Sequence, residues 1–203
     1  MGRFSQAIAE GDGISIVPVL ESDVAAVASL AEEAGAEAVA VAARDAVEVR
    51  MLTALPMVVE NVGESDLDRV VQARADGCTV VFDPDAGEGE LFDELFSAIQ
   101  GLDLDCAVEV RDEDALTEVL ERVDPEILII ASPRLDDEDE LEHVLDLLPD
   151  VPAGKLVIAR PRLPIVREQV VALERAGVDA VLVGAEVLRA PDFSAALAQL
   201  TGR

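Results

Sequence analysis

The sequence has few of the side chains that build metal, disulfide and stacking sites. It contains two cysteines and one histidine, and its aromatic content is 2%, with no tryptophan or tyrosine. A single histidine and the lack of a CxxC pair argue against a zinc site, and we expect neither a metal nor a cofactor. Scarce aromatic rings leave few platforms on which sugars or bases stack. Cys78 and Cys106 lie in or just before apolar runs, which favours buried free thiols over a disulfide.

Positive charge is also scarce. The chain has 43 Asp and Glu residues against 15 Lys and Arg residues, with Lys155 as its single lysine, and its formal net charge is −28. Such a chain repels polyanions, so nucleic acid is not an expected partner. The acidic, lysine-poor composition suits a salt-rich cytoplasm and equally suits a GC-rich genome, and both explanations remain open.

Long apolar runs are missing as well. No run reaches the roughly 18 residues that cross a bilayer, so a membrane is not an expected partner. The first 13 residues, MGRFSQAIAEGDG, lack the basic and apolar regions of a signal peptide, and we expect a cytoplasmic protein. Hydrophobic residues nevertheless make up 51% of the 203 residues, which is sufficient for one sizeable core.

The sequence does contain a repeated unit. ERAGVDAVLVG at 174–184 has a near copy, EEAGAEAVAVA, at 32–42, and weaker copies occur at 72–82 and 121–130. Each copy leads from the end of a charged helix, through a small or turn-forming pair, into an apolar run. Repetition of this kind is typical of a fold built from like units.

Apolar strand-like runs alternate along the chain with stretches of helical periodicity. The runs lack polar/apolar alternation, as expected of strands buried on both faces. Strands are predicted at 14–20, 38–42, 56–60, 79–82, 106–110, 126–131, 155–159 and 179–183, and helices at 22–34, 45–54, 65–75, 88–100, 112–122, 137–148, 164–176 and 192–200. Eight such units predict a single (βα)8 TIM barrel over residues 1–203 with short βα loops; a doubly wound sheet is the second interpretation.

Local signals mark several of the predicted helix ends. Ser22-Asp23, Asp112 and Asp192 are suitable N-cap or first-turn residues. Gly35 and Gly177 stand where a glycine commonly follows a helix.

The order of several segments resembles indole-3-glycerol phosphate synthase. These segments are RFSQAI, GISIVPVL, LPMVV, LDCAVEVRDEDAL and RAGVDAVLVG, and the resemblance extends from Arg3 to about Leu200. It implies a (βα)8 barrel and the decarboxylating ring closure of a phosphorylated anthranilate derivative in tryptophan biosynthesis, a lyase reaction. In that family two lysines, a glutamate and an asparagine act on the substrate, and glycine-rich loops after the seventh and eighth strands hold its phosphate. Residues 1–13 then correspond to a remnant of the N-terminal helix leading into the barrel.

The resemblance also identifies where this sequence departs from the family. Glu21 and Glu60 fall on the two lysine positions, and Ser132 falls on an asparagine position. Glu109 matches the family glutamate, and Gly184 matches the glycine after the eighth strand, whereas ARPRLP at 159–164 lacks the glycine of the other phosphate loop. Carboxylates in place of lysines would repel the acidic substrate, so the departures predict loss of the ordinary reaction.

Candidate site residues lie at the C-terminal ends of the predicted strands, where barrel enzymes carry their function. Glu21, Glu60 and Glu109 are the candidate catalytic acids or bases. Arg160, Arg162, Ser132 and Gly184 are the candidate ligand or phosphate-binding residues. The alternative is that these charges pair with one another across the barrel mouth as surface ion pairs.

Three functions remain open from the sequence. The leading hypothesis is a catalytically degenerate, synthase-like barrel that acts through binding or protein assembly. The alternatives are a divergent enzyme on a small phosphorylated metabolite, or a residual synthase, which would be a carbon–carbon lyase. A protein partner or a homo-oligomer would need an apolar outer face; Phe92 and Phe96 share one, although ordinary packing onto the barrel also explains them. His143 is expected to face solvent and receives no role.

Overall fold

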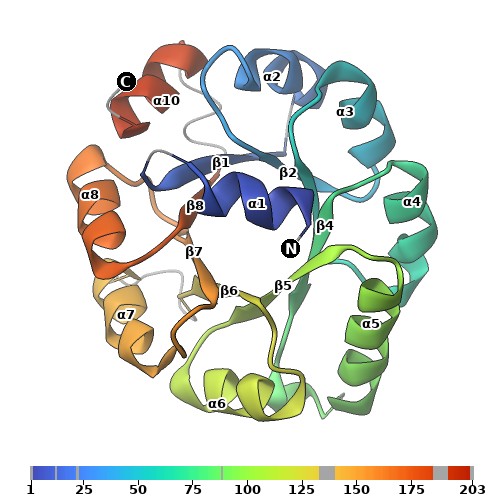
Figure 1. The fold of residues 1–203 in the computed structure, drawn as a ribbon. Helices are drawn as coiled ribbons and strands as arrows, with labels where there is room; N and C mark the ends of the chain where they lie inside the picture. Colours follow the sequence, from blue (N-terminus) through green and yellow to red (C-terminus); the bar gives the residue numbers. More distant parts are fainter. Residues whose placement is uncertain are drawn as a thin grey trace.

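A computed structural model describes residues 2–11, 13–21, 23–87, 89–132, 140–184 and 192–201. Eight parallel strands form a closed barrel in the order β1 to β8, with β8 paired to β1 (Figure 1). The strands are β1 (Ser15–Leu20), β2 (Val39–Ala42), β3 (Met57–Glu60), β4 (Gly77–Val81), β5 (Asp105–Val110), β6 (Ile127–Ala131), β7 (Leu156–Arg160) and β8 (Ala180–Val183). Closure confirms the predicted TIM barrel and excludes the doubly wound sheet.

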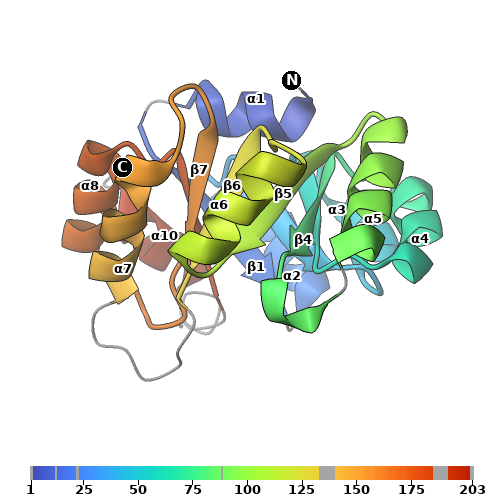
Figure 2. The same cartoon turned by 90° about the horizontal axis from the view of Figure 1, so that it is seen from below.

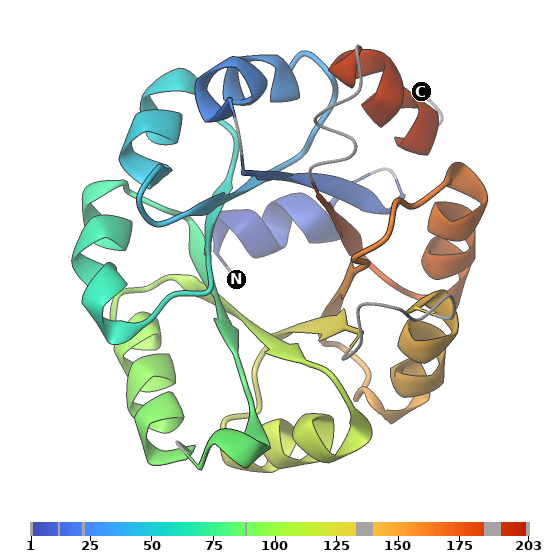
Figure 3. The ribbon, with the colours of Figure 1, turned by 180° about the vertical axis from the view of Figure 1, so that it is seen from behind.

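Helices surround the barrel; α2 to α8 connect successive strands, and α10 follows the last strand (Figure 3). They are α2 (Val24–Ala31), α3 (Ala46–Leu52), α4 (Leu67–Gln72), α5 (Gly89–Gly101), α6 (Glu113–Arg122), α7 (Glu140–Leu147), α8 (Arg167–Ala176) and α10 (Phe193–Thr201), with short 3-10 turns η1 (Glu64–Asp66), η2 (Pro84–Ala86) and η3 (Leu148–Asp150). No helix in these described ranges is long and apolar enough to cross a membrane.

The predicted elements match the observed ones closely, and the differences lie at helix ends. Each strand boundary falls within two residues of the prediction. Helix α2 ends at Ala31, three residues early, because the chain leaves it through a turn in which Gly35 has φ 86° and Ala36 N–H donates to the Ala31 carbonyl. Gly177 caps α8 with φ 99°, as predicted.

The predicted helix starts carry a capping hydrogen bond at two of three helices. Asp112 accepts a hydrogen bond from Ala115 N at 2.8 Å, and Asp192 accepts one from Ala195 N at 2.9 Å. Asp23 stands at the N-cap of α2, as predicted, but its backbone has a left-handed conformation and its side chain makes no capping hydrogen bond. Ser22 lies outside the described residues.

Side chains alternate along each strand, so the apolar ones face either the barrel interior or the surrounding helices. Inward-facing residues include Val17, Ala40, Val58, Ala107 and Ile158, and they form one cluster. Outward-facing residues form a larger cluster with the surrounding helices. Every residue of β1, β5, β6 and β8 is buried, which explains why these runs lack alternation in the sequence.

Helix α5 uses its two phenylalanines for this packing. The rings of Phe82 and Phe92 meet edge to face with centroids 4.8 Å apart, and Phe96 is buried beside them. Phe92 and Phe96 are 8% and 4% exposed, so the packing interpretation is confirmed. Cys78 and Cys106 are free and buried as predicted, and burial raises the pKa of the Cys78 thiol to about 12.

One end of the barrel, where the strands begin, is covered by helix α1 (Arg3–Ala9) (Figures 1 and 2). Phe4 and Ile8 are one helical turn apart and both join the interior cluster. We call this the closed end. The opposite end, where the strands finish, is called the mouth.

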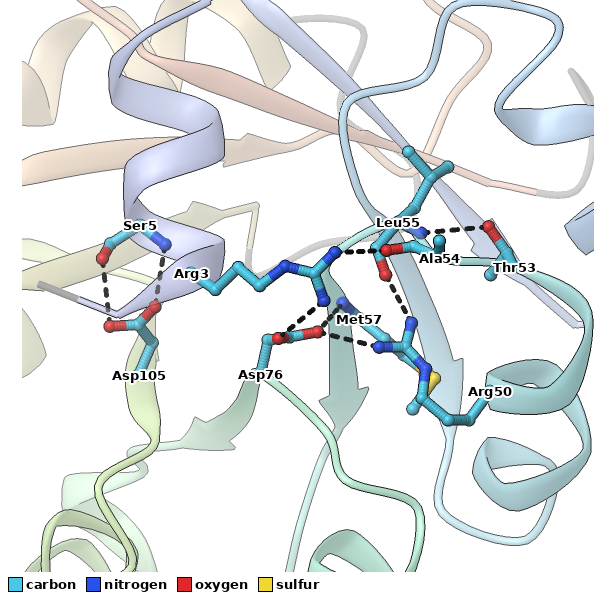
Figure 4. Close-up of polar contacts among 9 residues, drawn as sticks. All are labelled: Arg3, Ser5, Arg50, Thr53, Ala54, Leu55, Met57, Asp76 and Asp105. Carbon is cyan, nitrogen blue, oxygen red and sulfur yellow. Dashed lines mark hydrogen bonds and ion pairs between the residues drawn. The ribbon is translucent and has the colours of Figure 1, made fainter.

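Two buried carboxylates fasten the closed end (Figure 4). Asp105, the first residue of β5, accepts hydrogen bonds from Gly2 N at 2.9 Å, Ser5 N at 2.8 Å and Ser5 Oγ at 3.0 Å. Asp76 accepts from Met57 N at 2.8 Å and pairs with two arginines, Arg3 and Arg50. These contacts join α1 to β3, β4 and β5 and satisfy backbone donors at the helix start.

Candidate functional site

Three charged side chains from three alternate strands meet inside the barrel at its mouth. Glu60 is the last residue of β3, Glu109 is the fifth residue of β5, and Arg160 is the last residue of β7. Alternate strands of a (βα)8 barrel contribute side chains to the same interior layer, which explains why these three approach each other. Their side chains are 11%, 3% and 19% exposed, so the group is largely withdrawn from water.

The guanidinium group of Arg160 contacts both carboxylates, and that of Arg111 contacts Glu109. Arg160 Nη2 donates to Glu60 Oε1, and Arg160 Nε lies 3.3 Å from Glu109 Oε2. The Nε contact is an ion pair without hydrogen-bond geometry. Arg111 donates to Glu109 Oε1 from Nε at 3.2 Å and from Nη2 at 3.0 Å. We call Glu60, Glu109, Arg111 and Arg160 the mouth cluster; with every group ionised, its two acids and two bases balance.

The surroundings of Glu60 perturb its protonation. Burial raises the pKa of Glu60, while the charge of Arg160 and its hydrogen bond oppose the rise. The negative charges of Glu109 and Glu21 raise the pKa further. Glu60 is therefore a carboxyl suited to hold or release a proton.

The alternative of ion pairing across the mouth describes the contacts, with one correction. Surface pairs were expected, but Glu60, Glu109 and Arg160 form a buried group. A surface pair contributes about 0–1 kcal/mol, whereas loss of one partner from a buried pair leaves a costly uncompensated charge. The mouth cluster therefore matters more to stability than the sequence suggested.

The remaining predicted site residues lie around this cluster without joining it. Glu21 is exposed just after β1 and acts on Glu60 through its charge. Ser132 is buried at the end of β6, and Arg162 is half-buried in the loop after β7. Gly184 follows β8, and residues 185–191 after it lie outside the described residues, so its predicted part in phosphate binding stays a prediction.

Two charged residues with contacts in or near the site were not predicted from the sequence. Arg111, just after β5, was not assigned as the partner of Glu109; the spacing of two, which puts both side chains on one face, was the available signal. Glu140 is buried at the start of α7 and accepts hydrogen bonds from Arg162 N and Leu163 N. It lies in the acidic run DDEDELE at 136–142, so its charge alone did not distinguish it from the other acids of that run.

His143 also differs from its expected place. It was expected to face solvent, but it is half-buried and its Nε2 lies 2.8 Å from the Arg111 carbonyl oxygen. This contact joins α7 to the segment after β5.

The single lysine is remote from the mouth. Lys155 precedes β7, where its Nζ donates to the Pro125 carbonyl at 2.8 Å and pairs with Asp124 at 2.6 Å. Arg44 pairs with its neighbour Asp45 and is mostly exposed. Across the described ranges, no group of three or more His, Cys, Asp or Glu side chains is arranged to hold a metal ion. The chemistry that the mouth cluster offers is proton exchange and charge pairing.

Fold and site together define a (βα)8 barrel with a charged, partly buried group at the ends of its strands. The chain matches the family profile of indole-3-glycerol phosphate synthase over residues 19–200. It therefore belongs to the indole-3-glycerol phosphate synthase family, which confirms the resemblance seen in the sequence.

Individual relatives show how far the likeness extends. Indole-3-glycerol phosphate synthase of Acidovorax sp. (strain JS42) is 36% identical over 113 residues, which cover 56% of this chain and 42% of the relative. The enzyme of Geobacillus sp. (strain WCH70) is 25% identical over 187 residues, covering 86% of this chain and 71% of the relative. The chain thus matches less than half of the first relative. Thiamine phosphate pyrophosphorylase from Pyrococcus furiosus has a TM-score of 0.67 and 18% identity, covering 93% of this chain and 94% of that one, which shows a shared fold.

Proposed function

We propose that this chain is a catalytically degenerate member of the indole-3-glycerol phosphate synthase family that acts through binding or protein assembly. The observation that carries the proposal is the contact of Arg160 with both Glu60 and Glu109 inside the mouth. Each charge of that group is already balanced by another charge of the chain. Within the mouth cluster, therefore, no cation is left uncompensated for an acidic substrate.

The positions compared with the family support the same conclusion. Glu60 stands where the resemblance places the lysine that acts as general acid, and Glu21 stands at the second lysine position. Lys155 cannot replace either, because it lies before β7 and is bonded to Pro125 and Asp124. A positioned general acid contributes about 10²- to 10⁴-fold to a rate, so its loss alone would be severe.

One observation favours a second function, a divergent enzyme on a small phosphorylated metabolite. Burial raises the pKa of Glu60, and a carboxyl with a raised pKa is a better general acid near neutral pH. Glu109, 3% exposed and paired with Arg111, would be the second carboxyl of that site. In this alternative the mouth cluster is a rebuilt site in which Glu60 gives the proton.

Turnover of the carboxyphenylamino-deoxyribulose phosphate substrate tests the main proposal. Protein from a host that lacks its own synthase would be assayed by indole fluorescence at low and at molar salt. We expect no turnover above the buffer rate under either condition. Glu109→Gln, with Glu113→Gln as the control at an exposed acid in α6, separates real activity from contamination.

The two results are distinct. Turnover that is lost in Glu109→Gln and kept in Glu113→Gln would overturn the proposal and identify a residual synthase. Turnover equal in all three proteins would come from a contaminating enzyme and would leave the chain inactive, as proposed.

A further inference from the structure

The loop between β7 and α8 holds a carboxylate with its backbone. Glu140, the first residue of α7, is 6% exposed. Its Oε2 atom accepts hydrogen bonds from Arg162 N at 2.8 Å and from Leu163 N at 3.0 Å. Two consecutive backbone N–H groups that converge on one oxygen are the arrangement by which protein loops bind anions.

Glu140 occupies this position at an energetic cost. Its other oxygen, Oε1, is buried and has no hydrogen-bond partner among the residues that the structure describes. Glu140 also borders a small cavity of about 40 Å³ whose lining is mostly apolar, including Val144, Ala159 and Leu173. A buried carboxylate oxygen without a partner is destabilising, so burial of this side chain needs a compensating interaction. The two loop N–H groups provide it.

The loop is stiff and well placed for a ligand. Pro161 and Pro164 flank the two donors and fix φ on either side of them, so Arg162 N and Leu163 N lose little conformational freedom when they bind. The loop follows the seventh strand, a frequent location for phosphate groups in (βα)8 barrels. Arg160, the last residue of that strand, belongs to the mouth cluster, which places the donors two residues beyond the cluster.

We propose that Glu140 is an internal ligand that closes an oxyanion site formed by Arg162 N and Leu163 N. An external phosphate group, free or on a small phosphorylated metabolite, would enter only when the first turn of α7 withdraws the carboxylate. Glu140 thereby makes the chain reject phosphate at a loop that is otherwise competent to bind it. The inference concerns a site separate from the mouth cluster and goes beyond the proposed function.

Binding of inorganic phosphate to a set of Glu140 variants tests the inference. Glu140→Ala vacates the site, and Glu140→Asp keeps the charge but is too short to reach the two donors. Glu140→Gln keeps the length and one acceptor oxygen, so it should leave the loop occupied. Glu142→Ala removes one exposed acid from the same helix and controls for net charge. Titration calorimetry gives each affinity, and the amide resonances of Arg162 and Leu163 locate the binding.

Opening a site that the wild type keeps closed should raise the apparent affinity about tenfold or more. We expect this gain in Glu140→Ala and Glu140→Asp, with shifts of the Arg162 and Leu163 amide resonances. Glu140→Gln and Glu142→Ala should stay within about twofold of the wild type. If Glu140→Ala does not fold, Glu140→Asp makes the same test with the charge retained.

Three results would overturn the inference. The first is no gain in a folded Glu140→Asp variant. The second is an equal gain in Glu142→Ala, which would reflect net charge. The third is phosphate binding that leaves the Arg162 and Leu163 resonances in place. Parallel titration with glycerol 3-phosphate distinguishes a free phosphate ion from a phosphate ester as the tighter ligand. None of these measurements depends on turnover, so failure here and failure of the proposed function remain separate.

Discussion

At the closed end of the barrel, Asp105 accepts hydrogen bonds from backbone N–H groups of α1, whereas at the mouth Glu60 and Glu109 contact the guanidinium groups of Arg111 and Arg160. Both ends therefore bury carboxylates, but the partners of Asp105 are mainly backbone N–H groups, whereas those of Glu60 and Glu109 are arginine side chains. A backbone donor remains in place whatever residue replaces its acceptor, while a side-chain donor can be replaced together with it. Asp105 is consequently constrained by the backbone of the fold. The charged residues of the mouth cluster can instead be replaced together.

The largest expected effect is at the closed end. Asp105→Ala should lower the free energy of unfolding by about 3 kcal/mol, because it leaves Gly2 N, Ser5 N and the Ser5 hydroxyl without their shared charged acceptor. Urea denaturation followed by circular dichroism measures the change. Glu126→Ala, at an exposed acid before β6, is the control and should lie close to the wild type. Equal losses in the two variants would contradict the assignment of Asp105 as the fastening of α1.

Replacement of one member of the mouth cluster should have a smaller effect that a second change repairs. Arg160→Met leaves Glu60 and Glu109 with less compensating charge, and we expect a loss of about 2 kcal/mol in the free energy of unfolding. The double variant Arg160→Met, Glu60→Met should recover to within about 1 kcal/mol of the wild type, because Glu109 keeps its pair with Arg111.

The control for this pair is Arg162→Met, at a half-buried arginine of the same loop. It should change the urea midpoint little, because its guanidinium makes no ion pair within the described residues. A double variant less stable than Arg160→Met would show that the charged residues of the mouth cannot be replaced together. That result would contradict the difference proposed between the two ends.

The smallest effect is a change in how stability depends on pH. Because burial raises the pKa of Glu60 above its ordinary value of 4.5, protonated Glu60 is favoured in the folded protein. Its contribution to the free energy of unfolding is fully present below pH 4.5 and is lost as pH rises through the raised pKa. The glutamine in Glu60→Gln does not titrate. As pH rises, the free energy of unfolding of the wild type should therefore fall relative to that of the variant.

Urea midpoints of both proteins between pH 4 and pH 8 measure this difference (roughly the range over which carboxyls with raised pKa values titrate). Burial also raises the pKa of Asp179, against a hydrogen bond from Val157 N, but both proteins contain that group and its effect cancels. A difference that instead grows in favour of the wild type with rising pH would mean that attraction to Arg160 outweighs the burial of Glu60.

Much of the fold could be predicted from the sequence because its signals are local. Asp112 and Gly177 mark a helix start and a helix end through contacts with residues three or four positions away. The apolar runs identify strands buried on both faces, and their alternation with helices implies parallel pairing. Asp23 shows the limit, since a suitable residue type at a helix start does not guarantee the backbone conformation that capping needs.

The sequence allowed us to predict several residues of the candidate site, but not which of them contact each other. Glu60, Glu109 and Arg160 were each identified from their places at strand ends. Their mutual contacts depend on the barrel register, which sets the layer each side chain enters. Glu140 gave no signal, because its partners are backbone donors more than twenty residues later in the chain.

The sequence by itself determined the eight strand–helix units, the orientation of each charged residue at its strand end, and membership of the synthase family. The tertiary structure alone decided which charges meet. Glu60 and Arg160 are 100 residues apart, and a local pattern fixes only the face on which each one stands. Closure of the barrel brings those faces together, because β8 must pair with β1 before strands three, five and seven can share one interior layer.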